Sequence, residues 1–461
     1  MGLEAPTISE VESERLPRGA TQPWPKPALA WYSVAVFAVV LMLGEIERNA
    51  IRFLIEPIER DFHLHDWKIS ILVGVAPSIF YALVGVPMAR LVDSMRRNLI
   101  LSIAVAIGAV TTSISGLAQT FWQFAVCRVL VGGGGAINGP GTYSMMADYF
   151  PRPKLPRAIA ILQIGYISGN GLANVFGGLL VGLVAAWPVM HVAGLAIRNW
   201  QMVFVMAGGL GVLASLLLLT VREPARRGRA IQEPGQTMTL AQVAGYLWKY
   251  KALYAPQFLA LAFSAVETYG NESWRIVFLR RTYGWGPQLS GVVLGFSAIG
   301  AQLLGLIVGT WLTERLARTR DDANLRAVAI FYSITPIFAV IGPLMPNPWL
   351  SVVCSSLTGM CGLAGAVPQN AALQSVTPNE MRGQVTALYL FVFAVIGVGI
   401  GPTFMALITD FIVRDEFKIR YAMAGSAAIM TPLAAIIMWS GVKAYGRAIG
   451  EVKAREALGH G

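Results

Sequence analysis

Charged residues are scarce in this chain. Asp, Glu, Lys and Arg make up 13% of its 461 residues, whereas a typical soluble domain carries about 25%. Hydrophobic residues make up 55%, and there are 48 glycines, which let membrane helices pack closely. This composition argues against a soluble domain and indicates an all-α membrane protein. The net charge of +11 could suit a nucleic-acid-binding protein, but the basic residues fall between apolar runs, so we expect no nucleic-acid partner.

Cysteine and histidine are also few. The three cysteines lie in apolar runs and the four histidines are scattered, so neither a disulfide framework nor a metal-ligand motif is indicated. Glycine-rich segments occur at 132–135, 171–178 and 397–402. No Lys-Ser/Thr pair follows them, so close helix packing or hinges explain them better than phosphate binding. Because no catalytic motif is visible either, we expect no enzyme activity, no cofactor and no metal.

The chain contains many long apolar runs. A helix needs about 20 apolar residues to cross ~30 Å of hydrocarbon. Six such runs precede a basic segment at 222–251 and six follow it. We predict twelve transmembrane helices in two six-helix bundles, at 29–221 and 252–445, joined by a cytoplasmic linker at 222–251. The twelve candidate spans are roughly 29–55, 67–92, 98–118, 121–148, 155–184, 199–221, 252–280, 287–317, 324–344, 347–374, 381–411 and 419–445.

The segments outside the spans indicate the orientation. Residues 1–28 are polar and lack the apolar stretch of a signal peptide, so we predict a disordered tail. The even-numbered connections and the tail at 446–461 are basic, whereas most odd-numbered connections are neutral or mixed, such as ERDFHLHDWK. RDEFKIR and Arg280–Arg281 are weaker exceptions. Because cytoplasmic loops carry the excess of Lys and Arg, we predict that both termini are cytoplasmic.

The two halves of the chain repeat one another's loop motifs. ARLVDSMRRN follows the second span and GTWLTERLARTR ends the eighth, while Pro followed by Arg precedes the fifth and the eleventh spans. These features resemble the major facilitator superfamily, whose signature G-x-L-x-D-R-x-G-R-R is matched in part. A carboxylate at a helix end can receive an Arg and a helix N-terminus, which would latch the bundles on the cytoplasmic side. The candidate latching residues are Asp93, Arg97, Arg157, Glu314, Arg315 and Arg382.

A narrower resemblance, over about residues 30–440, is to the Spinster-like family and its bacterial members. It is carried by segments such as ERNAIRFLIEPIERDFHL, RVLVGGGGAINGPGTYSMMADYFP and MRGQVTALYLFVFAVIGVGIGPTFMALITD. Family members carry an Asp-Arg pair in the first span, here Glu47 and Arg48, and an Arg in the fourth, here Arg128. The acidic residue that accompanies this Arg in the family, and is implicated there in proton coupling, is Gly135 in this chain. The resemblance implies an exporter of lysolipid- or sphingolipid-like anions in a bacterial inner membrane.

Charged residues enter the first span in GEIERNAIRF, at 44–53. A charge in hydrocarbon costs several kcal/mol unless it is paired or hydrated. At about 1.5 Å rise per residue, Glu47 and Arg128 come to similar depths. We therefore expect them to meet in a wet chamber between the two bundles. Four residues of the segment share one helix face about 100° wide, with Glu47 beside it: Glu45, Arg48, Asn49 and Arg52.

The seventh and fifth spans also carry polar residues at helical spacing. A polar group inside a span either serves cargo or coupling, or holds helices together through interhelical bonds. We take both sets as candidates for cargo binding or coupling. They are Glu267, Asn271, Glu272, Trp274 and Arg275 in the seventh span, and Gln163, Tyr166, Asn170 and Asn174 in the fifth.

Together these features predict a secondary transporter that works by alternating access, with cargo bound between the bundles. We expect a small or amphipathic organic anion held by Arg48 and Arg128, because a guanidinium forks onto carboxylate or phosphate. Glu47 is expected to change protonation or to swap partners as the bundles rock. The rival hypothesis is a proton symporter for sugar acids or other organic anions. A sensor or a channel is disfavoured because no signalling module or pore loop is visible. We expect a monomer whose partners are cargo, protons and membrane lipids.

Overall fold

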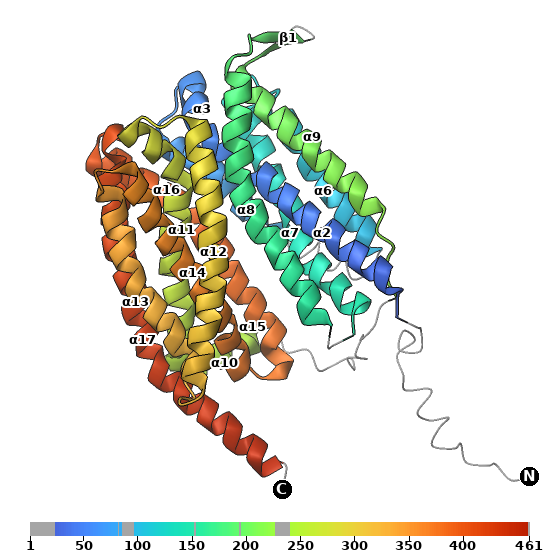
Figure 1. Cartoon of the computed structure of the whole chain (residues 1–461), viewed down its shortest axis with the longest axis vertical. Helices are drawn as coiled ribbons and strands as arrows, with labels where there is room; N and C mark the ends of the chain where they lie inside the picture. The colour runs from blue at the N-terminus through green and yellow to red at the C-terminus, as the bar shows by residue number, and fades with distance from the viewer. Residues whose placement is uncertain are drawn as a thin grey trace, which may run out of the picture.

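The computed structural model describes residues 24–81, 83–84, 96–151, 154–192, 195–225 and 240–459. Its helices form two groups that stand side by side (Figure 1). The N-half contains α2 (Pro27–Asn49), η1 (Ala50–Phe53), α3 (Ile55–Phe62), α4 (Asp66–Ser70), η2 (Ile71–Val75), α6 (Arg97–Ser115), α7 (Phe121–Tyr149), α8 (Leu155–Ala185) and α9 (Asn199–Leu219). After α10 (Leu240–Lys249), the C-half contains α11 (Lys251–Tyr283), α12 (Pro287–Ala317), α13 (Ala323–Leu344), α14 (Pro348–Val376), α15 (Asn379–Val392), η3 (Phe393–Ile400), α16 (Gly401–Leu407), η4 (Ile408–Val413), η5 (Glu416–Lys418) and α17 (Ile419–Gly459).

Nine helical segments among the described residues are long and apolar enough to cross a membrane. They coincide with nine of the twelve predicted spans. The other three predicted spans correspond to α4 with η2, to α7 and to α11. The second predicted span continues past residue 84 into a part of the chain outside the described residues. α11 has sufficient length, at 33 residues, but its charged residues lower its hydropathy, which is itself a sign that it faces more than lipid.

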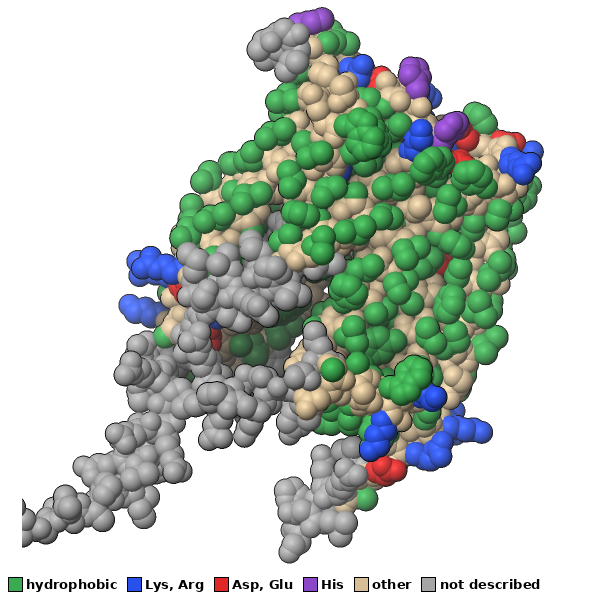
Figure 2. Space-filling model, turned by 180° about the vertical axis from the view of Figure 1, so that it is seen from behind, with side chains coloured by type: hydrophobic (Ala, Val, Ile, Leu, Met, Phe, Trp, Pro, Cys, Tyr) green, Lys and Arg blue, Asp and Glu red, His purple; other side chains and the backbone are tan. Residues whose placement is uncertain are grey.

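The two ends of the molecule differ in charge. One end carries α3 and a β hairpin, in which β1 (Met190–Val192) pairs antiparallel with β2 (Leu195–Ile197), and the other carries the start of α2 and the end of α17 (Figure 1). We call them the hairpin end and the termini end. Lys and Arg gather at the termini end, whereas acidic, basic and histidine side chains mix at the hairpin end, with a hydrophobic surface between (Figure 2). This distribution is what the positive-inside rule expects of a cytoplasmic termini end, and that orientation stays a prediction.

Local sequence signals set several helix ends. The side chain of Thr120 accepts from the N–H of Gln123, whose own side chain accepts from the N–H of Thr120, so a capping box starts α7. Gly284 ends α11 in a left-handed conformation with φ of 70°. α2 tightens into the 3₁₀ helix η1 inside the charged segment. A 3₁₀ segment at such a place often marks a functional hinge.

Aromatic rings hold the hairpin end of the N-half together. Trp200 of α9 contacts Phe62 of α3 and Phe124 of α7 edge-on, with ring centroids 5.9 Å and 5.8 Å apart. Phe124 also packs on Phe204 at 5.5 Å. Such ring pairs contribute about 0.5–1.5 kcal/mol each beyond the burial of their area. They fix α3, α7 and α9 against one another and so position the residues described below.

The two halves touch along seams of glycine. A Cβ at Gly291 of α12 would lie 2.4 Å from the carbonyl oxygen of Asn174 in α8. A second seam joins the π-helical segments η2 and η3, where a Cβ at Gly74 would lie 2.5 Å from the carbonyl oxygen of Gly399. Side chains cannot be placed at these distances. Glycine therefore permits direct backbone contact between the halves, as small residues do in other membrane helices.

Gly291→Ala is expected to weaken the contact of α8 with α12 by about 1–3 kcal/mol, the usual cost of overpacking. Because this seam joins the halves, the weaker contact should reduce the fraction of molecules whose two halves touch at the hairpin end. This fraction is measured from the distance between spin labels on the two halves. Gly300→Ala on the same helix is the control, since a Cβ there would meet open space. An unchanged population in Gly291→Ala would contradict the role of the seam.

Candidate functional site

A cavity of about 310 Å³ lies between the two halves, within the range of sites for small ligands. Helix α8 forms its N-half wall, and α11, α12, α13, α14 and η3 form the rest. One part of the lining is apolar: Leu261, Ile276, Leu294, Leu363 and Phe393. Another part offers hydroxyl and amide groups, among them Tyr166, Asn170, Asn174, Ser264, Thr268, Tyr269, Asn271, Gln302, Tyr332, Thr358 and Gln369.

Helix α11 supplies the charged side chains that line the cavity. Glu267 is buried and accepts hydrogen bonds from the side chains of Asn271 and Thr268. Arg275 follows two turns later, with Glu267 and Glu272 in electrostatic range. The buried Nε of Arg275 has no hydrogen-bond partner among the described residues. The carboxylate of Glu267 thus already accepts hydrogen bonds, whereas one N–H donor of the Arg275 guanidinium has no acceptor among the described residues.

An ion pair joins the halves beside the cavity. Nη1 of Arg52, in η1, donates to Oε1 of Glu272, in α11, at 2.7 Å. The side chain of Asn170, in α8, also donates to Glu272. Hydrogen bonds between two ionised groups are among the stronger ones in proteins. The pair therefore links the end of the first span to α11. Arg52 is buried in this contact and is not a solvated loop residue.

Arg48 is the exposed member of the charged segment. Its side chain is 55% exposed, and its Nη2 pairs with Oε1 of buried Glu45 at 2.9 Å. Asn49 donates to the other oxygen of Glu45 at 3.3 Å. Tyr166 and Tyr269, which both line the cavity, lie in electrostatic range of Arg48. Arg48 therefore presents a hydrated positive charge at the edge of the cavity.

Glu47 and Arg128 lie together, but inside the N-half. Thr112 of α6 donates to Oε1 of Glu47 at 2.5 Å, and a Cβ at Gly211 of α9 would lie 2.5 Å from Oε2. Arg128 is 3% exposed, stacks on the ring of Phe204 at 5.5 Å and lies in electrostatic range of Glu47. Its Nε and Nη1 have no hydrogen-bond partner among the described residues. This placement differs from the expected central chamber, because contacts from α6 and α9 enclose both side chains away from the cavity lining.

Two further candidates also lie away from the cavity lining. Trp274 is 1% exposed, and its Nε1 donates to the carbonyl oxygen of Pro402 at 3.0 Å. It therefore anchors α11 to α16. Gln163 accepts a hydrogen bond from the hydroxyl of Tyr143 at 3.0 Å, which links α8 to α7. Both side chains serve helix packing in this arrangement.

Sequence reasoning missed the polar wall of the C-half. The hydroxyl of Tyr332 donates to Oε1 of Gln369 at 3.0 Å, which joins α13 to α14 on the cavity lining. Tyr269 and Thr358 lie on the same lining. These residues belong to three different helices, so the spacing within any single helix does not reveal the wall they form. Only the packing of three helices brings them together.

The residues of the loop signatures belong to the termini end. Arg97 is buried, and it pairs through Nη1 with Asp148 at 2.6 Å and through Nε with Glu223 at 3.3 Å. These partners belong to the N-half, and Asp93 lies outside the described residues. An interaction between the two halves through these signature residues at the termini end therefore stays a prediction. The other signature residues are exposed: Arg157, Glu314, Arg315 and Arg382.

A comparison with protein families identifies the family of the chain. The family model described as Major Facilitator Superfamily matches residues 37–402. The chain belongs to the Major Facilitator Superfamily. It is therefore a secondary transporter and a multi-pass integral membrane protein, and it is not an enzyme.

Individual relatives of this major facilitator protein carry different names. It is 27% identical over 92% of its length to an "MFS-type efflux pump" of Mycolicibacterium smegmatis, of which 95% is covered. It is 26% identical over 69% of its length to a "Gallate transporter" of Pseudomonas putida, of which 73% is covered. A crystal structure of a bacterial homologue of the human lysosomal transporter Spinster, inward-facing and unoccupied, superposes with a TM-score of 0.74 and 22% identity over 92% of this chain and 98% of that chain. The predicted resemblance to Spinster is confirmed.

Proposed function

We propose that this transporter carries a small or amphipathic organic anion by alternating access. The observation that carries the proposal is where free hydrogen-bond donors remain around the cavity. Glu267 and Glu272 already receive donors, whereas Arg275 keeps an unpartnered Nε among the described residues and Arg48 is exposed. A carboxylate or phosphate would satisfy these guanidinium groups. A cationic cargo would find both lining carboxylates already occupied.

The roles of the predicted arginines divide accordingly. Arg48 and Arg275 contact the anionic group of the cargo from opposite halves. Arg128 stays enclosed in the N-half, where it balances the charge of Glu47. Arg52 holds Glu272 and thereby ties the halves together beside the cargo.

The apolar part of the lining favours a cargo with a hydrocarbon portion. The side chains of Leu261, Leu363 and Phe393 lie on the same cavity as Arg275. A lysolipid- or sphingolipid-like anion would place its headgroup at the arginines and its chain along these residues. Burial of apolar surface would then add about 25 cal/mol per Å² to binding.

A hydroxylated organic acid is the second candidate, and a specific observation favours it. Oδ1 of Asn271 is buried on the cavity lining without a hydrogen-bond partner among the described residues. A cargo hydroxyl would satisfy it. The relative named a gallate transporter is consistent with this chemistry, because gallate joins a carboxylate to several hydroxyl groups. In this case the hydroxyl and amide groups of α13 and α14 would hold the cargo.

Proton coupling through Glu47 belongs to the same proposal. Its carboxylate is buried, it accepts a hydrogen bond from Thr112, and its nearest opposite charge is the equally enclosed Arg128. A carboxylate in such a site can exchange a proton when helices move. The Glu47→Gln variant is accordingly expected to lose the effect of a pH gradient on transport.

Counterflow in proteoliposomes tests the function. The purified protein is loaded with an unlabelled candidate and presented with the labelled compound, with and without a pH gradient. Lysophosphatidylglycerol represents the lipid-like class and gallate the hydroxylated acids; a quaternary ammonium compound serves as the cationic control. Counterflow of one anion, with none of the cation, is the expected result. Counterflow of the cation alone would contradict the assignment of Arg48 and Arg275.

A further inference from the structure

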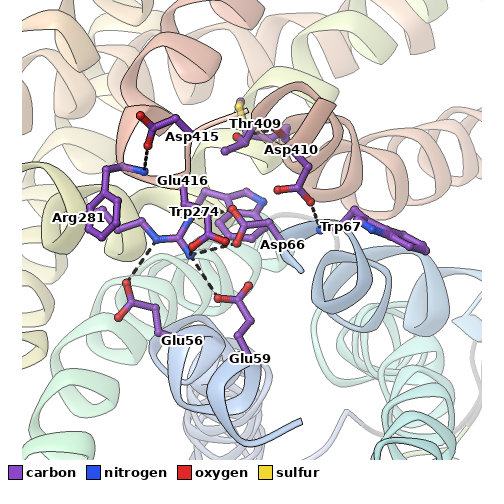
Figure 3. A network of polar contacts seen from close by, with 12 residues as sticks. Glu56, Glu59, Asp66, Trp67, Trp274, Arg281, Thr409, Asp410, Asp415 and Glu416 are labelled. Atoms are coloured by element: carbon purple, nitrogen blue, oxygen red, sulfur yellow. Dashed lines mark hydrogen bonds and ion pairs between the residues drawn. The ribbon is translucent and has the colours of Figure 1, made fainter. Parts of the chain in front are cut away.

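A charged cluster at the hairpin end joins the two halves (Figure 3). Arg281, at the end of α11, reaches from the C-half to the N-half. Its Nη1 pairs with Oδ2 of Asp66 at 2.8 Å, its Nη2 with Oδ1 of Asp66 at 3.0 Å, and the same Nη2 with Oε2 of Glu59 at 3.2 Å. We call the following residues the latch: Glu56, Glu59, Asp66, Arg280, Arg281 and Glu416.

The latch holds more carboxyl groups than guanidinium groups. Arg280 pairs with Glu56 at 2.7 Å, and Glu416 lies 3.7 Å from Arg281. Four carboxyl groups thus share two arginines. The side chain of Glu416 is 54% exposed, whereas the other three carboxyl side chains are at most 11% exposed. If these three were ionised, the closed latch would bury more negative charge than Arg281 can balance. Uncompensated buried charge costs several kcal/mol, and groups in this situation neutralise by binding a proton.

Two of these carboxyl groups converge on one nitrogen of Arg281. Glu59 is 9% exposed and Asp66 is 1% exposed, and Oε2 of Glu59 and Oδ1 of Asp66 both accept from Nη2 of Arg281, at 3.2 Å and 3.0 Å. Two buried carboxylates held this close repel each other, and a proton bound by one of them removes the repulsion. Oε1 of Glu59 is buried and receives no bond from a donor group among the described residues. Burial, and next the charge of Asp66, raise the pKa of Glu59 above its ordinary value.

We propose that the closed latch binds one proton between Glu59 and Asp66 and releases it when the hairpin end opens to water. Opening would separate Arg281 from the N-half and hydrate both carboxyl groups, which would then ionise independently. A metal ion is a poorer ligand for the site, because no group of three or more His, Cys, Asp or Glu residues among the described residues could hold one. The inference goes beyond anion transport, since it needs only the movement of the two halves.

Other charged groups lie on the neighbouring elements but interact with partners outside the latch. Asp410 of η4 accepts from the backbone N–H of Trp67 at 3.0 Å and has His65 in electrostatic range. Lys418 of η5 pairs with Asp415 at 3.0 Å. His65 is therefore replaced in one of the control variants below. The remaining charged or histidine residues of α3, α4 and the connection between them are Arg60, Asp61, His63 and Lys68.

The direction of the pH effect follows from proton linkage. In the closed arrangement burial, and next the charge of Asp66, raise the pKa of Glu59 above its ordinary value. Hydration on opening would remove the burial and weaken the repulsion, so under this proposal the pair binds one more proton when closed than when open. Closure is therefore favoured as pH falls and lost as pH rises above the ordinary range of a carboxyl group. For one proton, the ratio of closed to open molecules changes by up to about tenfold per pH unit.

Spin labels across the hairpin end measure this ratio without any cargo. Labels are attached at Trp122→Cys in the N-half and Phe417→Cys in the C-half, after Cys127, Cys354 and Cys361 are replaced by alanine. Distances are recorded in lipid nanodiscs between about pH 5.5 and about pH 8.5. The short-distance population is expected to fall as pH rises. The variants are made in a Glu47→Gln background, so that this other buried carboxyl group cannot contribute a response of its own. In Glu59→Gln on this background, the short-distance population is expected to stay constant across this range.

Matched variants separate the latch proton from other titrations. His65→Gln and Glu47→Gln should both keep the pH response, because neither removes the carboxyl pair. Asp66→Asn should lose it as Glu59→Gln does, and it carries the test if Glu59→Gln folds poorly. A response that survives in both Glu59→Gln and Asp66→Asn, or that disappears in His65→Gln, overturns the proposal. None of these outcomes depends on which anion is transported.

Discussion

Arg275→Gln is expected to weaken cargo binding by about 10- to 150-fold. The substitution removes a guanidinium that lines the cavity and whose Nε has no hydrogen-bond partner among the described residues. A hydrogen bond to a charged group contributes about 1.5–3 kcal/mol, and each 1.4 kcal/mol is a factor of ten in affinity. Binding of the anion identified by counterflow would be measured by calorimetry in detergent, so that the result does not depend on transport rate.

Two matched variants serve as controls for this prediction. Arg275→Lys keeps the charge but not the planar fork, so it should recover part of the affinity. Arg326→Gln removes an arginine that pairs with Asp322 at 2.5 Å away from the cavity, and it should bind the anion normally. If Arg275→Gln bound the anion as tightly as Arg326→Gln does, Arg275 would not be part of the cargo site.

Arg128→Gln is expected to cost stability rather than affinity. Arg128 is almost fully buried, and the carboxylate in its electrostatic range is that of Glu47. Removal of one member of a buried charge pair leaves the other uncompensated, at a cost of about 3–5 kcal/mol. The melting temperature in detergent should fall clearly, while the anion affinity of the molecules that remain folded should change little.

The double variant shows whether the loss comes from the pair. In Glu47→Gln/Arg128→Gln no charge is left uncompensated, so the melting temperature should recover part of the loss seen in Arg128→Gln. Arg326→Gln is again the control, because its ion pair is at the protein surface. A loss of anion affinity in Arg128→Gln that exceeds the loss in Arg275→Gln would show that Arg128 is part of the cargo site.

The membrane-spanning helices could be predicted well because their signal is local. Nine of the predicted spans correspond to helices that meet the length and hydropathy of a membrane span. The hydrophobic runs need no knowledge of their neighbours, since lipid imposes the same requirement on each of them. The β hairpin between α8 and α9 was not predicted, because its strands are only three residues each and short strands have little periodicity to detect.

The candidate site could be predicted only in part. Helical spacing grouped Gln163 with Tyr166, Asn170 and Asn174, and Trp274 with Glu267, Asn271 and Arg275. The cavity is lined by these residues except Gln163 and Trp274. The spacing could not show which face of the first span meets the cavity. Glu47 and Arg48 are adjacent in sequence, yet one is enclosed by α6 and α9 while the other is exposed.

The latch is a feature that the sequence contained in separate pieces. The acid-rich connection ERDFHLHDWK and the pair Arg280–Arg281 lie more than two hundred residues apart. Each departs from the neutral composition expected of its side of the membrane, and together they are complementary in sign. That complementarity is a signal that could have suggested an ion-pair network between the halves.

The sequence by itself determined that this protein crosses a membrane many times and belongs to a superfamily of transporters. Apolar length and loop motifs are properties of contiguous residues, so they survive without coordinates. Only the tertiary structure decided which buried charges are satisfied within one half, which face the cavity and which join the two halves. Those outcomes depend on distances between helices far apart in the chain, and the free energy of a buried charge depends on the partner that such packing brings to it.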